Sequence, residues 1–462
     1  MSFLIALAAL ALLMLVAYRG YSVILFAPVC ALLAVLVTDP AAVPALFTGL
    51  FMDKMVGFVK LYFPVFLLGA VFGKVIELSG FSKSIVAAVI RFVGRERAML
   101  SIVLVCALLT YGGVSLFVVV FAVYPFAAEM FRQGNIPKRL IPGTIALGAF
   151  TFTMDSLPGT PQIQNIIPTT FFKTTTWAAP WMGLIGSVFI LLLGMAYLEW
   201  RRRAAAAAGE GYGTGHTQEP EPMADEQLAH PLVALLPLVL VGVMNKLLLT
   251  LIPAYYGTSY EVQLAMAKPL VTPVASIQAI WAVEGALLLG ILAVLLFAFR
   301  PVARRFAEGS KAAVAGSLLA AMNTASEYGF GAVIAALPGF LVIQKGLQAI
   351  PNPLVNEAVS VTALAGITGS ASGGMSIALA AMSEQFITAA NAAGIPMDVL
   401  HRVAAMASGG MDTLPHNGAV ITLLTVTGLT HRTSYRDIFT ITCIKTLAVF
   451  FVIAVYYLTG IY

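Results

Sequence analysis

Two aspartates lie inside apolar segments that otherwise have the composition of membrane-spanning helices. Asp155 occurs in "MDSLPGTPQ" (154–162) and Asp412 in "MDTLPHNGA" (411–419), so the pattern Met-Asp-hydroxyl-Leu-Pro appears twice. A charged side chain at the centre of a membrane helix costs about 2.5–3.5 kcal/mol on insertion scales, which makes each aspartate a functional candidate. The proline that follows each aspartate lacks an N–H group and breaks the helix there. Freed N–H groups and positive helix N-termini favour an anion, whereas freed carbonyls and the carboxylates favour a cation or a proton.

Further polar residues surround the two breaks and fill two glycine-rich segments. Hydroxyl and amide side chains can bind a carboxylate or a hydroxyl group, and glycine lets the backbone approach a ligand closely. We expect the two breaks to be symmetry-related walls of one site near the membrane centre. The residues expected to contact the substrate are Gly112, Gly113, Ser115, Asp155, Ser156, Thr160, Gln162, Asn165, Ser370, Ser372, Gly373, Gly374, Ser376, Thr413 and Asn417. The alternatives are a helix N-cap for the aspartates and, for the amides, a bond that only secures the broken backbone.

The two breaks differ in the residue after the proline, which is Gly159 in the first and His416 in the second. A histidine with an unperturbed pKa of ~6.5 can exchange a proton near neutral pH. We therefore expect Asp412 and His416 to carry a proton-linked step, and Asp155 mainly to hold the first break and the substrate. A histidine that only packs in the core is the alternative. We expect no arginine at the depth of the breaks, so helix ends and hydroxyl groups would bind most of an anionic substrate.

The composition is that of an all-α polytopic membrane protein. The 462 residues are 60% hydrophobic and 10% charged, whereas soluble domains average roughly 25% charged residues. The apolar run 279–299 is long enough to cross a hydrocarbon core of ~30 Å. The net charge of +5 resides in loops and does not indicate nucleic-acid binding. The three cysteines lack metal-ligand spacing and no P-loop is present, so we expect no metal site, no cofactor and no ATP hydrolysis.

Four motifs recur in the same order in the two halves of the chain. They are "GKVIELSGFSKSI" around Glu77 and "NTASEYGFGAVI" around Glu327, "GGVSLFV" and "GGMSIAL", "GNIPKRL" and "AGIPMDV", and the two Met-Asp patterns. Between the halves, the Gly-, Pro- and Glu-rich stretch 201–230 is predicted to be a flexible cytoplasmic linker. The predicted units are therefore a first repeat, 1–200, and a second repeat, 231–462. We expect an architectural or gating role for the two glutamates.

Positive charge predicts the orientation of the two repeats. Segments 91–97 and 132–139 are both basic and flank one apolar stretch, so the chain between them is expected to enter from the cytoplasm and return, with its tip at 111–115. The matching hairpin, with its tip at 368–376, starts and ends in stretches poor in lysine and arginine, as expected for the opposite side. Each inverted repeat should hold about five spans, one re-entrant hairpin and one broken helix, near 154–162 or 411–418. Both termini are then expected to be periplasmic.

The segments "GGVSLFVVV", "MDSLPGTPQIQN", "TGSASGGMSIAL" and "MDTLPHNGAV" resemble the gluconate permease family of the ion transporter superfamily. The resemblance covers nearly the whole chain and is closest to the branch associated with 3-hydroxybutyrate. It implies a symporter of the bacterial inner membrane that imports small hydroxy- or keto-monocarboxylates, such as 3-hydroxybutyrate or gluconate, together with protons. It also implies a homodimer with a scaffold and a mobile, elevator-like transport domain within the lipid bilayer.

Three other functions are compatible with parts of the sequence. A Na⁺-coupled carboxylate symporter would use the same breaks. An intramembrane aspartyl protease could use two membrane aspartates that share one proton, but the proline after each aspartate and the missing Gly-x-Gly-Asp pattern argue against it. A passive channel would not accumulate its substrate against a gradient. We therefore expect a transporter and not an enzyme.

Overall fold

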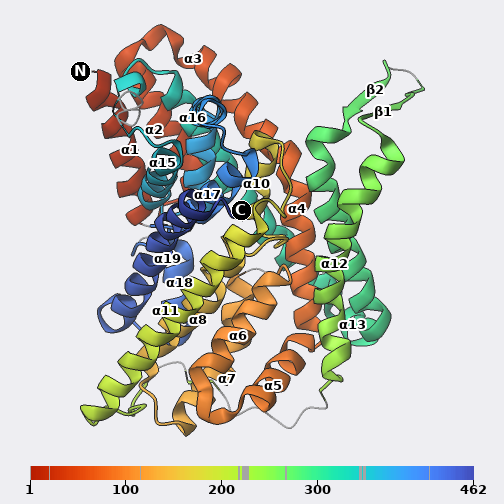
Figure 1. Ribbon diagram of the computed structural model, residues 1–462, viewed down its shortest axis with the longest axis vertical. Coiled ribbons are helices and arrows are strands. Elements are labelled where there is room, and N and C mark those ends of the chain that lie inside the picture. The colour runs from red at the N-terminus through yellow and green to blue at the C-terminus, as the bar shows by residue number, and fades with distance from the viewer. Residues whose placement is uncertain are drawn as a thin grey trace.

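The computed structural model describes residues 2–19, 21–114, 116–216, 219–220, 228–265, 268–342, 346, 350–415 and 417–462. Nearly all of these residues lie in helices, and the one strand pair that they form is β1 (Ser259–Val262) with β2 (Leu270–Pro273) (Figure 1). In the part of the chain that the structure describes, five helical segments are long and apolar enough to cross a membrane: Pro40–Leu78, Pro180–Ala207, Pro231–Tyr256, Val274–Ala336 and His431–Thr459. The expected all-α polytopic membrane fold is confirmed, with the short exposed β-hairpin as an unpredicted addition.

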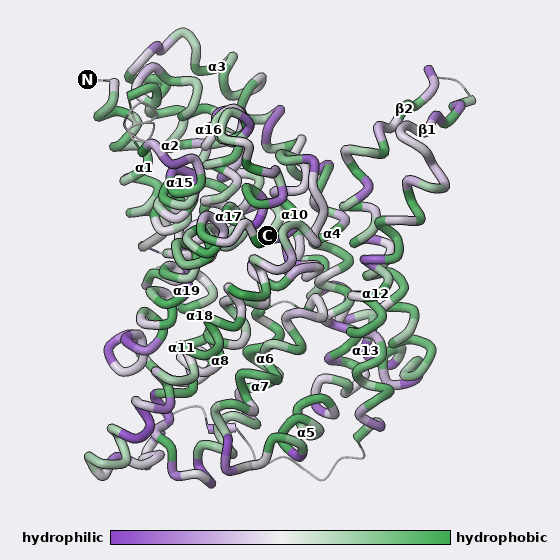
Figure 2. Tube along the Cα trace, in the orientation of Figure 1, coloured by the Kyte–Doolittle hydropathy of each residue, from purple (hydrophilic) through white to green (hydrophobic). Residues whose placement is uncertain are grey.

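Hydropathy follows the helices as a bilayer requires. Figure 2 shows hydrophobic residues along most helices and hydrophilic stretches near helix ends, for example at the C-terminal end of α11 (Pro180–Ala207). On α12 (Pro231–Tyr256) large apolar side chains such as Leu232, Val239 and Tyr255 are exposed. Exposed apolar side chains along a spanning helix are the surface that lipid covers.

The first half of the chain contains two helices that pack together, a long span, a hairpin and a broken span. The bounds of its remaining elements are α1 (Ser2–Tyr18), α2 (Val23–Thr38), η1 (Pro40–Ala42), α3 (Val43–Ala45), η2 (Leu46–Phe51), α4 (Met52–Leu78), α5 (Phe81–Val93), η3 (Arg95–Arg97), α6 (Ala98–Tyr111), α7 (Leu116–Gln133), η4 (Lys138–Leu140), α8 (Ile141–Ala149), α9 (Phe152–Asp155) and α10 (Ile163–Phe172). The short helix α5 ends at Gly94, which has a positive φ.

The second half begins with α12 and the β-hairpin and also contains a long helix, a hairpin and a broken span in that order. Its remaining helices are α13 (Val274–Ala336), α15 (Pro353–Thr368), α16 (Ala371–Ala392), α17 (Met397–Ser408), α18 (Gly418–Thr427) and α19 (His431–Thr459). The 63-residue α13 is two helices joined at a kink, because Ala298 has non-helical backbone angles and Pro301 lies shortly after it. Its second part packs extensively against α4 of the first half.

The two hairpins are the helix pairs α6–α7 and α15–α16. Gly113 (φ 95°) lies between the first pair and Gly369 (φ 65°) between the second, so each tip uses the left-handed backbone conformation that glycine adopts most easily. Figure 1 shows the first pair in the lower part of the molecule and the second pair in the upper part.

Each hairpin is followed by an interrupted helix. The first interruption lies between α8 and α10, with the four-residue α9 inside it, and the second lies between α17 and α18. Each interrupted helix packs against the other half of the chain. Helix α10 packs against α16 and α17, and α18 packs against α7 and α8. We therefore propose that the elements up to α11 and those from α12 onward are the two inverted repeats.

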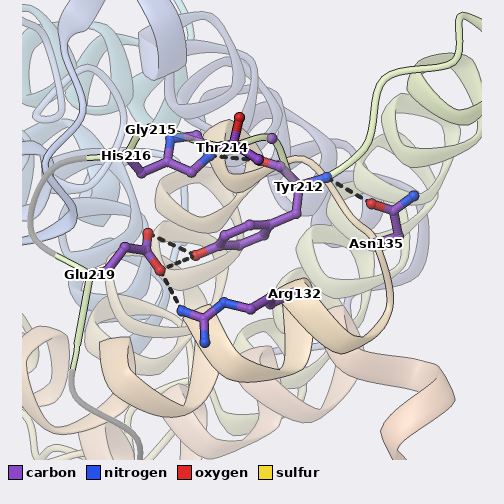
Figure 3. Close-up of a pocket in the computed structure, with 8 residues that line it drawn as sticks. Arg132, Asn135, Tyr212, Thr214, Gly215, His216 and Glu219 are labelled. Carbon is purple, nitrogen blue, oxygen red and sulfur yellow. Dashed lines mark hydrogen bonds and ion pairs between the residues drawn. The ribbon is translucent and has the colours of Figure 1, made fainter.

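The stretch expected to be a linker differs from that expectation at its start. Helix α11 continues to Ala207, and the chain after it binds the base of the first hairpin (Figure 3). Arg139 Nε lies 2.6 Å from Glu210 Oε1, and this hydrogen bond lowers the pKa of Glu210. Glu219 accepts hydrogen bonds from Lys138 and Arg132. Beside these contacts lies a groove of about 670 Å³, lined by Arg132, Asn135, residues 212–216 and Glu219.

The hairpin topology predicts a pattern of chemical labelling. In a background with all three native cysteines replaced, Glu96→Cys and Gln133→Cys should both react with a membrane-impermeant thiol reagent from the cytoplasmic side, and Ala392→Cys only from the other side. All three positions lie at helix ends, at the two hairpin bases. Labelling of positions 96 and 133 from opposite sides would show that α6 and α7 together cross the bilayer, which contradicts a re-entrant hairpin.

Candidate functional site

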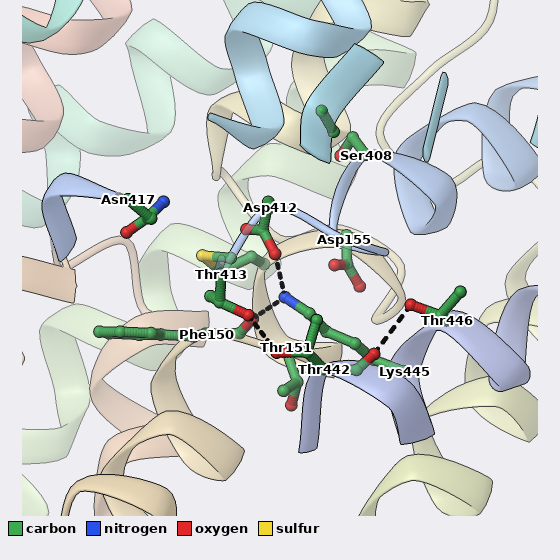
Figure 4. A network of polar contacts seen from close by, with 12 residues as sticks. Phe150, Thr151, Asp155, Ser408, Asp412, Thr413, Asn417, Thr442, Lys445 and Thr446 are labelled. Atoms are coloured by element: carbon green, nitrogen blue, oxygen red, sulfur yellow. Dashed lines mark hydrogen bonds and ion pairs between the residues drawn. The ribbon is translucent and has the colours of Figure 1, made fainter. Parts of the chain in front are cut away.

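The two interrupted helices are joined by a lysine on a third, continuous helix. Lys445 of α19 is 3% exposed, and its Nζ donates hydrogen bonds to Asp412 Oδ1 and to the Phe150 carbonyl oxygen, the latter at 3.0 Å (Figure 4). Phe150 follows the last residue of α8, and Asp412 lies in the interruption after α17. One ammonium group therefore binds the first break through its backbone and the second break through its carboxylate.

Asp155 has a different environment from Asp412. Its Oδ1 accepts a hydrogen bond from Ser156 Oγ at 2.8 Å, and a Cβ atom added to Gly409 would lie 2.1 Å from its Oδ2. The first aspartate thus packs directly against the C-terminal end of α17. Among the described residues no ion pair forms at Asp155, whereas Asp412 is paired with Lys445.

A second buried cation lies close to Asp155. Arg402 of α17 is fully buried and makes four hydrogen bonds: two to the Ala178 carbonyl, one to the Asp155 carbonyl and one to Asn165 Oδ1. The expectation that no arginine lies at the depth of the breaks is therefore wrong. The guanidinium secures the loop backbone of the first half to a helix of the second half.

Asn165 is a junction between the same two parts of the chain. Its Nδ2 donates to the Thr160 and Thr176 carbonyls, and its Oδ1 accepts from Arg402 and lies 3.2 Å from His401 Nε2. Thr160 Oγ1 in turn donates to a carbonyl of α9, that of Thr153. In this structure Asn165 and Thr160 therefore stabilise the interrupted backbone, which was the alternative to substrate contact.

The amides at the start of α10 and α18 connect each break to its own hairpin. Gln162 Nε2 donates to the Thr110 carbonyl at 2.7 Å, at the end of α6. Asn417 Nδ2 donates to the Gly369 carbonyl at 2.8 Å, at the end of α15, while its Oδ1 caps α18 at the Val420 N–H. In both halves an amide at the N-cap position thus donates to a carbonyl near a hairpin tip, although the Thr110 carbonyl also accepts from the Gly113 N–H group and only Asn417 caps its helix as well.

The four predicted glycines lie against other parts of the chain. An added Cβ atom at Gly112 would lie 2.4 Å from Leu238, and one at Gly113 would lie 3.1 Å from Pro161. In the second hairpin, an added Cβ atom at Gly373 would lie 1.6 Å from Glu327 Oε2, and one at Gly374 would lie 2.2 Å from the Ala365 backbone. These close approaches support a packing role for the glycines at the hairpins.

The predicted hydroxyl groups fall into three environments. Ser370 Oγ caps α16 at Gly373 N, and Ser372 Oγ lies 3.1 Å from Thr324 Oγ1. Thr413 Oγ1 hydrogen-bonds Thr442 next to the Lys445 site. Ser376 is buried, and its Oγ has no hydrogen-bond partner among the described residues. Ser115 and the predicted proton carrier His416 lie outside the described residues.

Buried carboxylates break the symmetry of the two repeats. Glu77 is exposed and pairs with Lys74 at 2.9 Å, whereas its counterpart Glu327 is buried with Oε2 unpartnered among the described residues. Glu357 on α15 is fully buried, and neither of its oxygens has a partner in the described part of the chain. Glu77 and Glu327 therefore lie in different environments, and their architectural or gating role stays a prediction.

Sequence reasoning missed Lys445, Arg402 and Glu357. Each lies in a largely apolar stretch, such as "ITCIKTLAV" for Lys445 and "LHRVAAM" for Arg402, where His401 is the neighbouring residue. The rule that marked the two aspartates also applies to them, because intramembrane charges are rare and face the protein interior.

Loss of the hydrogen bond between a break amide and a hairpin-tip carbonyl should destabilise the protein. Asn417→Ala should cost about 1–3 kcal/mol, because the buried Gly369 carbonyl loses its side-chain donor. Gln162→Ala should cost less, because the Thr110 carbonyl keeps the hydrogen bond from the Gly113 N–H group. Asn417→Ser should lose the bond to the Gly369 carbonyl but keep a side chain that caps helices well. Thermal unfolding of the purified protein measures the effect, with exposed Asn391→Ala as the control. Equal melting temperatures of Asn417→Ser and the unaltered protein would show that the hydrogen bond from Asn417 to the Gly369 carbonyl contributes nothing to stability.

Loss of the buried Arg402 guanidinium should reduce the stability of the protein more than loss of either amide. Arg402→Ala should reduce stability by ~3–5 kcal/mol, since three polar acceptors lose their charged donor inside the protein. Arg402→Lys should recover only part of this, because an ammonium cannot reproduce the planar donor geometry. The exposed Arg304→Ala is the matched control for thermal unfolding. A melting temperature for Arg402→Lys equal to that of the native chain would contradict the assigned role.

Comparison with known proteins places the chain among transporters. No family model matches it. It is 60% identical over 471 aligned positions to a Bacillus subtilis (strain 168) protein named "Uncharacterized transporter YxjC", with the whole of both chains covered. Its fold is similar to the crystal structure of the Alcanivorax borkumensis YdaH transporter, with a TM-score of 0.51, 15% identity, and coverage of 91% of this chain and 90% of that one. The chain therefore belongs to the family of the Bacillus subtilis transporter YxjC and is a membrane transporter.

Proposed function

We propose that this protein is a secondary active symporter that imports a small hydroxy- or keto-monocarboxylate with protons. The observation that carries the proposal is the meeting of two helix breaks from different halves of the chain around buried Asp155, Asp412, Lys445 and Arg402. Broken helices from inverted repeats that meet at one point are typical of secondary transporters. The resemblance to the gluconate permease family supplies the substrate class, with 3-hydroxybutyrate and gluconate as the candidates.

The charges of the site favour one carboxylate over two. Arg402 uses four of the five guanidinium N–H groups on protein acceptors, and Lys445 is occupied by Asp412 and the Phe150 carbonyl. Neither cation is available for the bidentate binding that a dicarboxylate would require at both ends. The N-terminus of α10 has no side-chain cap among the described residues, and its N–H groups can bind a single carboxylate.

Proton coupling is proposed to act through the aspartates at the breaks. Asp412 and His416 are the sequence-based candidates. The structure adds Lys445 as the partner of Asp412, and it leaves Asp155 without an ion pair among the described residues. A carboxylate that alternates between a neutral and a charged form is suited to proton transfer in a membrane. Sodium coupling is the second possibility for the same breaks.

Movement is proposed to follow the elevator pattern that the resemblance implies. Helices α1, α2, α4, α12 and α13 pack against one another and form a candidate scaffold. The hairpins and interrupted helices, with α11 and α19, form the other packed group and contain the charged residues of the site. A homodimer in the bacterial inner membrane, with both termini in the periplasm, completes the proposal.

Uptake by purified protein in liposomes tests the function. An inward proton gradient should drive accumulation of labelled 3-hydroxybutyrate, and unlabelled lactate or gluconate should compete more strongly than succinate. Collapse of the gradient with a protonophore should abolish accumulation but leave counterflow exchange. Succinate competition as strong as that of the best monocarboxylate would contradict the substrate class. Equilibration without accumulation would indicate a channel, and cleavage of a peptide substrate would indicate a protease.

A further inference from the structure

The groups that bind the Lys445 ammonium are the kind that bind a free cation in other transporters. The Phe150 carbonyl lies at the C-terminal end of α8, where a helix break has left it without an intrahelical donor. The Asp412 carboxylate lies beside it, in the break of the other repeat. Freed carbonyls, half-helix C-termini and carboxylates coordinate Na⁺ at such breaks. The negative end of the helix dipole adds to the attraction.

Here the cation belongs to the protein itself. Lys445 extends from α19, a continuous 29-residue helix that packs against both α8 and α17. Its side chain is buried, so the stem fills the space beside the two oxygens. A covalently attached ammonium cannot dissociate when the substrate leaves, and it neutralises Asp412 in every state in which the contact persists.

We propose that the Lys445 ammonium occupies the position of a coupling cation, so that the transport cycle takes up no Na⁺ at this site. The inference deepens the proposed symport function and rests on it. It also predicts that removal of the ammonium exposes a carboxylate and a carbonyl that can accept a small free cation instead.

The first measurement uses the unaltered protein. Uptake of labelled 3-hydroxybutyrate into liposomes, driven by a fixed proton gradient, should be the same in sodium chloride and in choline chloride. A requirement for Na⁺, with uptake lost in choline, would overturn the proposal while leaving the carboxylate transport function intact.

The second measurement uses Lys445→Ala. Its uptake in choline chloride should fall by at least about tenfold, because removal of one partner of a buried ion pair leaves the other charge unpaired. Ammonium, methylammonium or Na⁺ should raise its melting temperature in a saturable manner, and Na⁺ should also raise its uptake. Neither effect should occur in the unaltered protein. The exposed Lys311→Ala on α13 is the control and should show neither loss nor rescue. The absence of any cation effect on Lys445→Ala would overturn the proposal.

The melting measurement does not depend on the substrate. If the native protein transports no monocarboxylate but cations stabilise Lys445→Ala, the proposed function is wrong and the cation site stands. If Lys445→Ala does not fold, Lys445→Gln combined with Asp412→Asn removes both charges together and should fold without a response to cations. A cation response in this double variant would show that the ions act elsewhere, which contradicts the assignment.

Discussion

A helix that breaks inside a bilayer leaves backbone groups without partners, and the protein must satisfy them because no water is available there. This constraint explains most of the polar contacts near the two breaks. Lys445 binds the carbonyl that ends α8, and Arg402 binds carbonyls of the chain around α9 and α11. Asn165 donates to two further carbonyls. The two buried cations Lys445 and Arg402 therefore stabilise the broken backbone, and Lys445 also pairs with Asp412.

The same constraint couples the two halves of the chain. Lys445 and Arg402 belong to the second half, yet each donates to a carbonyl of the first break. The amides Gln162 and Asn417 act within their own halves, between a break and a hairpin tip. The hairpin, the break and the opposite half thus form one hydrogen-bonded unit.

The repeats are similar in their backbone and different in their charges. Both have a glycine tip, an N-cap amide and an aspartate at the break, but only Asp412 has a lysine partner among the described residues. Glu327 is buried where Glu77 is exposed. The two breaks therefore share a backbone arrangement, but their aspartates lie in different electrostatic environments.

The sequence by itself determined the membrane fold class and the positions of the two aspartates, because hydropathy, proline and charge act locally and can be recognised along the chain. It also marked Gln162 and Asn417 as polar residues of the breaks. Only the tertiary structure decided which carbonyl each amide binds, that Arg402 and Lys445 face the breaks, and that the hairpin glycines pack against neighbouring helices. The physical reason is that partner choice depends on contacts between residues far apart in the sequence, from 48 positions for Asn417 with Gly369 to 295 for Lys445 with Phe150. The order of residue types along the chain does not indicate which distant backbone group lies within hydrogen-bonding distance of a side chain.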